Sequence, residues 1–331
     1  MLIVDNVSLA ILLCVVTMLG WGSWANTQKL AGKDHWPFPL FYWDYAIGVL
    51  AFGILFALTA GSMGTAGEPA LANLGHASAP AIVRAVLSGV LFNISNILLV
   101  VAIGAAGMSL AFPVGVGLAL VIGTVVSYLQ TPKGSAPLLF SGVGLVVLAM
   151  VMAALAYSKL PRKVGVNAAR GITYSVIAGC LMGYFYPQLI GAISPSFHSQ
   201  PIRPGLLTPY SALLLFGAGV FVSNFVVNGV FLKVNHLKYS DYRAGSVRLH
   251  SIGVLGGAIW MLALCLNIIA SGIAGPAVSY ALGQGATLIA AIWGVFIWKE
   301  FKGAPRGVTP FIVLMFLGYA TGLALIGIAT L

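Results

Sequence analysis

The sequence is poor in charged residues. Only 7% of its residues are Asp, Glu, Lys or Arg, whereas soluble domains carry roughly 25%. Six carboxylates are too few to help build a water-facing surface, and 60% of the residues are hydrophobic. The composition therefore excludes a soluble globular protein and indicates a chain that is embedded in lipid.

Cysteine and recognisable catalytic motifs are also scarce. Cys14, Cys180 and Cys265 each lie within an apolar run, without CxxC or CxxH spacing, and the histidines are scattered. We therefore expect no metal. The chain has no Walker motif, catalytic triad, nucleophile elbow or paired carboxylates, so we expect a protein that is not an enzyme and holds no cofactor. Its net charge of +10 includes no basic cluster interleaved with aromatic residues, so we expect no nucleic-acid partner.

The chain instead contains long apolar runs. A helix needs about 20 apolar residues to cross the hydrocarbon core of a bilayer. We therefore predict an all-α, multi-pass integral membrane protein of ten transmembrane helices. The predicted spans are residues 8–27, 40–60, 83–104, 108–128, 136–157, 169–191, 210–233, 250–271, 276–297 and 309–330.

The links between these spans differ in length and composition. The link over residues 61–82 is rich in Gly, Ala and Ser, which predicts a mobile loop. Two other links are very short and contain Gly107 and Gly275, so each is expected to be a tight helical hairpin with glycine at the turn.

Lysine and arginine are unevenly distributed among the links. Of the 16 in the chain, 13 lie in or beside the odd-numbered links, counted from the N-terminus. Because loops rich in Lys and Arg stay in the cytoplasm, the odd-numbered links are predicted to be cytoplasmic. The expected location is the cell (inner) membrane, with both termini outside, on the periplasmic side.

The two halves of the chain resemble each other. Gly115-Val116-Gly117 matches Gly283-Gln284-Gly285, and Gly22-Ser23-Trp24 matches Gly183-Tyr184-Phe185. Five spans per half is an odd number, so the halves must insert in opposite orientations, which is a recurrent plan in transporters. The predicted units are a first five-helix repeat over residues 1–157, a cytoplasmic linker over 158–168 and a second five-helix repeat over 169–331.

Hydrogen-bonding and aromatic side chains form stripes on several of the spans. Trp21, Trp24 and Gln28 share one helical face, which would form a flat platform with hydrogen-bonding groups at its rim. An interfacial aromatic belt and helix–helix hydrogen bonds are alternative interpretations of such stripes. The candidate substrate-binding residues are Trp21, Trp24, Gln28, Asn93, Tyr184, Gln188, Asn228, Tyr280 and Gln284.

Asp44 is the carboxylate most expected to lie within the membrane, a few residues into the second span. A charge at the membrane centre costs roughly 2.5–3.5 kcal/mol on insertion scales, so it needs a partner or a function. Pairing with Lys29, proton binding and substrate contact are open alternatives, as is a structural salt bridge near the membrane surface. We predict a coupling or gating role, with H⁺ or Na⁺ as the coupling ion.

Several of these motifs together resemble the ureide permease family of the drug/metabolite transporter superfamily. They are Gly22-Ser23-Trp24, Tyr42-Trp43-Asp44-Tyr45, Asn93, Pro187, Asn228 and the stretch from Trp293-Gly294 to Glu300. Ala25 stands where the family usually has proline, and the long central segment of the plant members is missing, so the chain looks like a short bacterial form. The resemblance implies the drug/metabolite transporter fold and import of allantoin or oxo-heterocycles such as uracil and xanthine.

The sequence thus predicts a secondary transporter that takes up a small planar polar solute, a ureide or a nucleobase, by alternating access. Sugar uptake is the alternative, because aromatic faces also stack on pyranose rings and the related glucose/ribose uptake and rhamnose symporter families share the plan. A non-transporting membrane sensor or subunit would lack a solvated central cavity. The expected partners are a small-molecule substrate and bilayer lipid, in a monomer or a homodimer.

Overall fold

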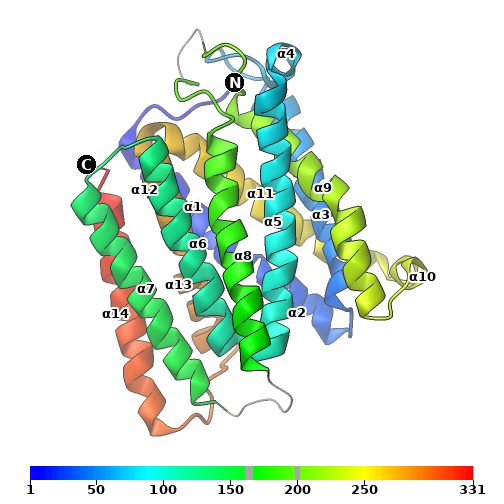
Figure 1. Cartoon of the computed structure of the whole chain (residues 1–331), viewed down its shortest axis with the longest axis vertical. Coiled ribbons are helices and arrows are strands. Elements are labelled where there is room, and N and C mark those ends of the chain that lie inside the picture. Colours follow the sequence, from blue (N-terminus) through cyan, green and yellow to red (C-terminus); the bar gives the residue numbers. More distant parts are fainter. Residues whose placement is uncertain (161–166, 198–201, 331) are drawn as a thin grey trace.

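The chain folds into a bundle of long helices that run mostly along one axis (Figure 1). The computed structural model describes residues 1–160, 167–197 and 202–330, and this part of the chain contains helices and no named strand. The helices are α1 (Val7–Ser23), α2 (Ala25–Lys33), α3 (Phe38–Leu58), α4 (Ala70–His76), α5 (Ala79–Ala106), α6 (Met108–Gln130), α7 (Ala136–Ser158), α8 (Ala168–Ile190), α9 (Pro209–Val234), α10 (Tyr239–Arg243), α11 (Val247–Ala274), α12 (Pro276–Gly283), α13 (Ala286–Ile292), the π-helical turn η1 (Trp293–Ile297), the 3-10 turn η2 (Arg306–Val308) and α14 (Thr309–Ile328).

Within the described residues, nine helical segments are long and apolar enough to cross a membrane. They are α1 with α2, α3, α5, α6, α7, α9, α11, α12 through η1, and α14. Helix α8 is not among these nine, although it has 23 residues, as many as α7, and packs against α5 and α6. Both termini lie at the same end of the bundle (Figure 1). The prediction of an all-helical, multi-pass membrane protein is confirmed.

Two predicted spans are interrupted rather than continuous. The first bends where α1 passes into α2 at Trp24. The ninth stops at Gly283, restarts as α13 at Ala286 and ends in the π-helical turn η1. Such interruptions leave backbone groups outside the regular helical ladder and bring bends into the bundle.

Glycine forms the two tight hairpins, as predicted. Gly107 joins α5 to α6 with φ 79°, and Gly275 joins α11 to α12 with φ 88°. Residues with a Cβ rarely adopt this left-handed region, so glycine is the residue these turns require. The helices that precede the two turns, α5 and α11, are both 28 residues long.

The packed helix pairs occur in matching sets. Helix α1 packs against α11. Helix α8, which opens the second half, packs against α5. In the same way, the packed pair α3–α11 matches the packed pair α9–α5. The packed pair α1–α13 matches the packed pair α8–α6. The pairs α3–α9, α7–α14 and α6–α12 each join helices that the predicted repeat places at equivalent positions.

Glycine also allows close packing of α3 on α11. A Cβ on Gly48 would overlap the Val254 carbonyl, and one on Gly257 would overlap the Tyr45 carbonyl. Small residues that let helix backbones approach are typical of membrane bundles, where dispersion contacts rather than water expulsion drive helix association.

The prediction of a loop over residues 61–82 was wrong for residues 70–76, which form α4, and for residues 79–82, which begin α5. The side chain of Asn73 on α4 accepts a hydrogen bond from the Thr208 backbone N–H at 2.8 Å and donates one to the Leu206 carbonyl at 3.1 Å. These bonds tie the link to the start of α9, and composition alone does not reveal such a distant partner.

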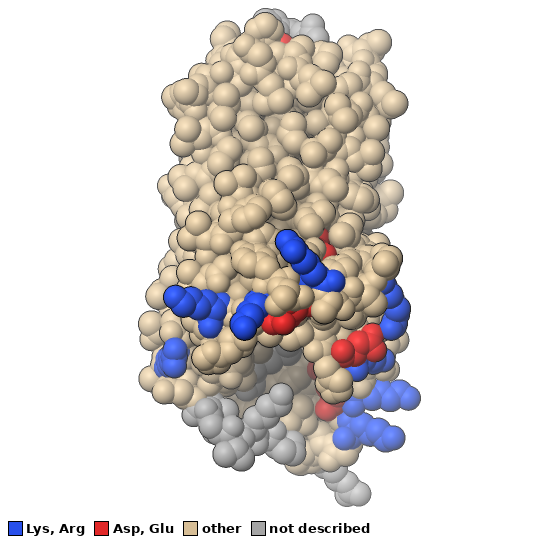
Figure 2. Space-filling view, turned by 90° about the vertical axis from the view of Figure 1, so that its right-hand side faces the viewer, with Lys and Arg blue, Asp and Glu red and all other residues tan. Residues whose placement is uncertain are grey.

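Charged side chains collect at the end of the bundle opposite the termini, called the charged end here. On the face shown in Figure 2, Lys, Arg, Asp and Glu form a band near this end, and the long surface above it is almost uncharged. Helices α2 and α10 lie at this end (Figure 1). The band marks where apolar surface gives way to groups that need water.

Candidate functional site

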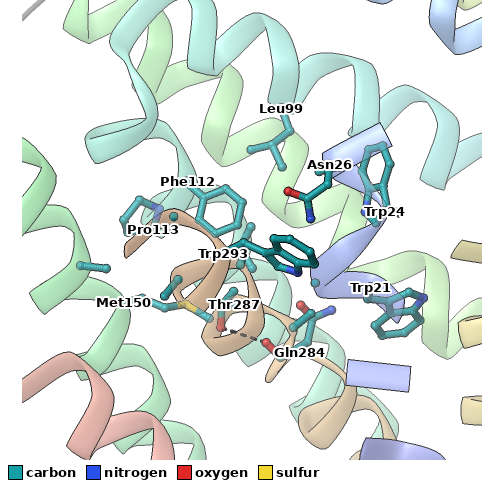
Figure 3. Close-up of a pocket in the computed structure, with 18 of the residues that line it drawn as sticks. Trp21, Trp24, Asn26, Leu99, Phe112, Pro113, Met150, Gln284, Thr287 and Trp293 are labelled. Carbon is teal, nitrogen blue, oxygen red and sulfur yellow. Dashed lines mark hydrogen bonds between the residues drawn. The ribbon is translucent and has the colours of Figure 1, made fainter. Parts of the chain in front are cut away.

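A cavity of about 730 Å³ lies inside the bundle and is lined by residues of both halves. The first half contributes α1, α2, α5, α6 and α7, and the second contributes α8, α11, α13, η1 and α14. Figure 3 shows rings from several of these helices pointing toward a shared space. Its volume falls within the roughly 300–1,000 Å³ typical of small-molecule sites.

Four buried aromatic rings form the inner wall of the cavity. Trp21 stacks on Trp260 with ring centroids 5.8 Å apart, and Phe92 lies 4.0 Å from Trp260. Phe185 on α8 packs against Phe92 at 5.4 Å. The Trp21 indole N–H donates to the Trp260 carbonyl at 3.3 Å, which fixes its ring. The four rings, which come from α1, α5, α8 and α11, thus form one continuous aromatic surface of the cavity.

Polar groups are interspersed among these rings. The Asn96 amide donates to the Tyr42 hydroxyl at 3.2 Å, and the Thr287 hydroxyl donates to the Gln284 carbonyl at 3.0 Å (Figure 3). Trp24 lies beside Tyr45, with ring centroids 4.9 Å apart.

The Trp24 indole N–H and the Gln28 amide have no hydrogen-bond partner in the part of the chain that the structure describes. Both side chains line the cavity. Because they are not engaged elsewhere, these two groups are available to bind the edge of a solute.

An ion pair lies at the rim of the cavity near the charged end. Lys29 Nζ is 2.7 Å from Glu300 Oε1, and the Tyr157 hydroxyl donates to Glu300 Oε2 at 2.6 Å. The Lys29 ammonium also lies 4.2 Å from the centre of the Trp298 ring, whose N–H donates to Asn26 at 2.6 Å. The rim thus joins α2 of the first half to the segment after η1 of the second.

Four of the predicted substrate-binding residues line the cavity: Trp21, Trp24, Gln28 and Gln284. They come from α1, α2 and the interruption in the ninth span. The structure therefore brings together the face predicted on the first span and the polar residue beside Gly283 and Gly285.

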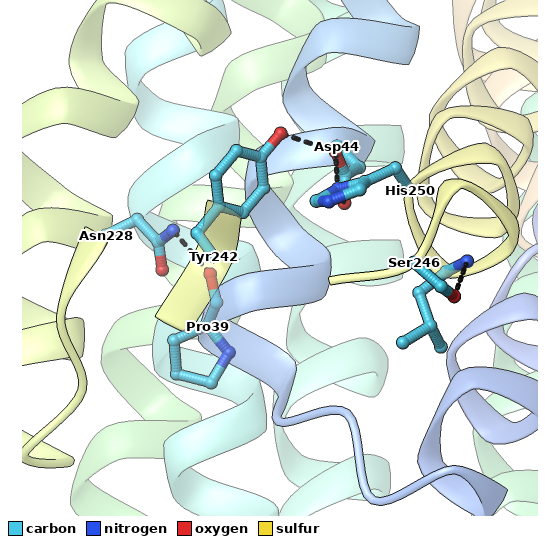
Figure 4. A network of polar contacts seen from close by, with 7 residues as sticks. Pro39, Asp44, Asn228, Tyr242, Ser246 and His250 are labelled. Atoms are coloured by element: carbon cyan, nitrogen blue, oxygen red, sulfur yellow. Dashed lines mark hydrogen bonds and ion pairs between the residues drawn. The ribbon is translucent and has the colours of Figure 1, made fainter. Parts of the chain in front are cut away.

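The other five lie outside the cavity lining. Tyr184 is 44% exposed on α8. The side-chain carbonyl of Gln188 accepts a hydrogen bond from the Arg84 Nε–H at 3.3 Å. Tyr280 is fully buried, with its hydroxyl 3.3 Å from two backbone carbonyls of neighbouring helices. Asn93 donates to Ser223 at 2.8 Å, and Asn228 donates to the Pro39 carbonyl at 2.9 Å (Figure 4).

Asp44 is buried near the charged end and does not line the cavity. The Tyr242 hydroxyl donates to its carboxylate at 2.6 Å, and His250 Nδ1 lies 3.0 Å from both carboxylate oxygens (Figure 4). Burial and the adjacent carboxylate raise the pKa of the Tyr242 hydroxyl, which therefore stays protonated and can donate. The alternative that pairs Asp44 with Lys29 is wrong, because Lys29 pairs with Glu300.

Glu300 is a cavity carboxylate that was not among the candidate site residues. In the sequence it marked only the end of a stretch that resembles the ureide permease family. Other lining residues outside the candidate set include Phe92, Asn96, Phe185, Trp260 and Trp293. The signal that could have found Phe185 is the repeat itself, because Phe185 matches Trp24 and both line the cavity.

Asn224 on α9 is fully buried, and neither its side-chain oxygen nor its nitrogen has a hydrogen-bond partner within the described residues. Such a group forfeits about 1–3 kcal/mol of desolvation free energy. We therefore expect Asn224→Leu to raise the free energy of unfolding by about 1 kcal/mol or more, measured by thermal unfolding in detergent.

Asn228→Leu is the matched control for this prediction. It lies one turn away on the same helix but removes the hydrogen bond to the Pro39 carbonyl, so it should destabilise the protein. A loss of stability in Asn224→Leu as large as that in Asn228→Leu would contradict the prediction and indicate that Asn224 has a partner in the membrane.

Comparison with known proteins agrees with the resemblance seen in the sequence. Residues 41–163 match the family described as Ureide permease. A solved structure described only as "Crystal structure of protein" superposes with a TM-score of 0.65 at 15% sequence identity, covering 96% of this chain and 97% of that chain. Similarity at this level of identity shows a shared fold over nearly the whole chain and says nothing of function.

Proposed function

We propose that this protein is a secondary-active transporter that takes up a small planar polar solute, of the ureide or nucleobase class, by alternating access. The observation that carries the proposal is the cavity of about 730 Å³, lined by aromatic rings and amides of both halves. Ring faces stack on flat solutes, and Gln28 and Trp24 supply hydrogen bonds at the edges. The family match over residues 41–163 favours a permease over an enzyme.

The proposed architecture is ten membrane spans in two inverted five-helix repeats, residues 1–157 and 169–331, with α8 as the sixth span. The matching sets of packed helices and the two glycine hairpins support it. Two termini at one end of the bundle agree with an even number of crossings. The concentration of Lys and Arg supports a cytoplasmic charged end, with both termini outside the cell membrane.

In this arrangement the cavity faces the cytoplasm, and the aromatic cluster of Trp21 and Trp260 blocks the outer side. The interrupted spans at Trp24 and at Gly283 are the hinges on which the halves would move. The Lys29–Glu300 pair bridges the two halves at the rim and is 42% and 29% exposed. An exposed pair of this kind contributes roughly 0–1 kcal/mol, so it can open and close without a large cost.

Asp44 is proposed to act on gating rather than on the substrate, because it holds α3 to α10 and α11 at the charged end. The proposed coupling ion is H⁺ or Na⁺. The Asp44 network would then link the cytoplasmic segment around α10 to movements of the spans.

Tracer uptake into proteoliposomes tests the function. We expect allantoin, uracil or xanthine to accumulate, and to compete with one another, while ribose and glucose do not. Uptake of a sugar alone would assign the alternative function, and uptake of none of the five would contradict the proposed substrate class. Imposed pH and sodium gradients give the coupling: uptake that responds to neither would leave a facilitator instead of a symporter.

A further inference from the structure

A second hollow, of about 500 Å³, lies at the charged end where α9 passes into α10. Lys233, His236, Lys238 and Tyr239 line it, and no carboxylate is among its lining residues. The nearby Asp241 carboxylate accepts a hydrogen bond from the Lys238 backbone N–H at 2.7 Å. The hollow therefore offers two ammonium groups and a phenol to an anionic ligand.

The exposed face of α9 leads directly into this hollow. Val222 and Val226 are 65% and 70% exposed and lie about two turns and one turn before Gly229, respectively, on the same helical face. Lys233 follows Gly229 by one further turn. Side chains exposed to this degree on an apolar membrane helix contact lipid chains. Figure 2, which views the molecule from the α9 and α10 side, shows uncharged surface meeting the Lys and Arg band.

Gly229 keeps the passage between the apolar face and the basic hollow open. A Cβ added at Gly229 would meet only the Tyr239 hydroxyl, at 3.7 Å. The Tyr239 ring packs beside Trp43, with ring centroids 5.7 Å apart. Tyr239 itself is 51% exposed, and exposed tyrosine concentrates at the depth of lipid headgroups, which favours a position of the hollow at the membrane interface.

We infer that this hollow binds the headgroup phosphate of an anionic phospholipid from the leaflet at the charged end. Lys233 and Lys238 would neutralise the phosphate, and one acyl chain would lie along Val222 and Val226. A membrane-facing basic hollow that continues into apolar helix surface fits a lipid better than a soluble anion, which would gain nothing from the valines. The site is separate from the central cavity, and the inference does not depend on what that cavity transports.

Native mass spectrometry of the purified full chain tests this inference, with phosphatidylglycerol and phosphatidylcholine of identical acyl chains as the probes. We expect the chain to prefer phosphatidylglycerol. The double variant Lys233→Gln/Lys238→Gln should weaken phosphatidylglycerol binding by about 30-fold, since each interfacial lysine contributes about fivefold. Phosphatidylcholine binding should change little.

Two further variants make the test specific. Gly229→Leu keeps both lysines but fills the passage, so it should weaken phosphatidylglycerol binding by about tenfold. The double variant Lys159→Gln/Lys302→Gln removes the same number of charges from exposed lysines outside the hollow and should bind as the parent chain does.

Equal binding of the two lipids by the parent chain, or unchanged phosphatidylglycerol binding in Lys233→Gln/Lys238→Gln, would overturn the inference. Inorganic phosphate is the third probe. If it displaces phosphatidylglycerol at millimolar concentration, the hollow is a soluble-anion site and the lipid assignment fails.

Discussion

Replacing Trp24 with alanine should weaken substrate binding by about 10- to 100-fold. Trp24 lines the cavity, its ring lies beside Tyr45, and its indole N–H has no partner among the residues that the structure describes. A stacked aromatic ring contributes about 1–3 kcal/mol to binding a flat base, and each 1.4 kcal/mol is a factor of ten. The dissociation constant of the proposed ureide or nucleobase substrate, measured on purified protein, gives the effect directly.

Conservative and remote variants separate stacking from general damage. Trp24→Phe keeps an aromatic face but lacks the indole N–H, so we expect a loss smaller than about fivefold. Trp36→Phe changes a tryptophan between α2 and α3 that does not line the cavity, so it should bind substrate normally. If Trp24→Ala binds as tightly as Trp36→Phe, the cavity is not the substrate site.

The positions of the helices could be predicted from the sequence because hydrocarbon imposes a simple rule. Each apolar run had to be long enough to cross the bilayer and had to satisfy its own backbone hydrogen bonds. Helix α6, predicted over 108–128, forms over Met108–Gln130. The interruption at Gly283 could also be anticipated, since two nearby glycines weaken a helix. Helix α4 could not be anticipated, because the residue that anchors it, Thr208, lies far along the chain.

The helical phase explains two of the five predicted site residues that lie outside the cavity lining, Tyr184 and Asn93. Adjacent residues on a helix point about 100° apart, so an error of one position moves a side chain to a different neighbour. Tyr184 was chosen on α8, whereas its neighbour Phe185 lines the cavity. Asn93 was chosen on α5, whereas Phe92 and Asn96 line it. Polarity favoured Tyr184 and Asn93, whereas aromatic rings form much of this cavity wall.

The roles of the two carboxylates show a second limit. Depth in a predicted span drew attention to Asp44, whereas Glu300, at the end of the ninth predicted span, was not chosen as a site residue. The structure places Glu300 on the cavity rim, because the chain turns after η1 and returns its carboxylate toward Lys29 and Tyr157. Neither the turn nor the partners can be predicted from local sequence, since the residues that meet lie on different helices.

Asp44→Ala should lower the free energy of unfolding by about 2–4 kcal/mol. The substitution leaves the Tyr242 hydroxyl and the His250 ring without their buried acceptor, and each hydrogen bond to a charged group contributes about 1.5–3 kcal/mol. Asp34→Ala is the matched control, because Asp34 pairs with Arg248 on an exposed surface, where such a pair contributes roughly 0–1 kcal/mol. Thermal and denaturant unfolding in detergent would measure both variants.

The proposed gating role of Asp44 predicts that binding and transport respond differently to the milder variant Asp44→Asn, which keeps the shape of the side chain. Because Asp44 does not line the cavity, the substrate dissociation constant should change by less than about twofold. Uptake should fall by at least about tenfold, since the amide replaces the carboxylate that holds α10 and α11 to α3. If folded Asp44→Asn protein transports normally, Asp44 has only a structural role. If it no longer binds substrate, Asp44 belongs to the binding site.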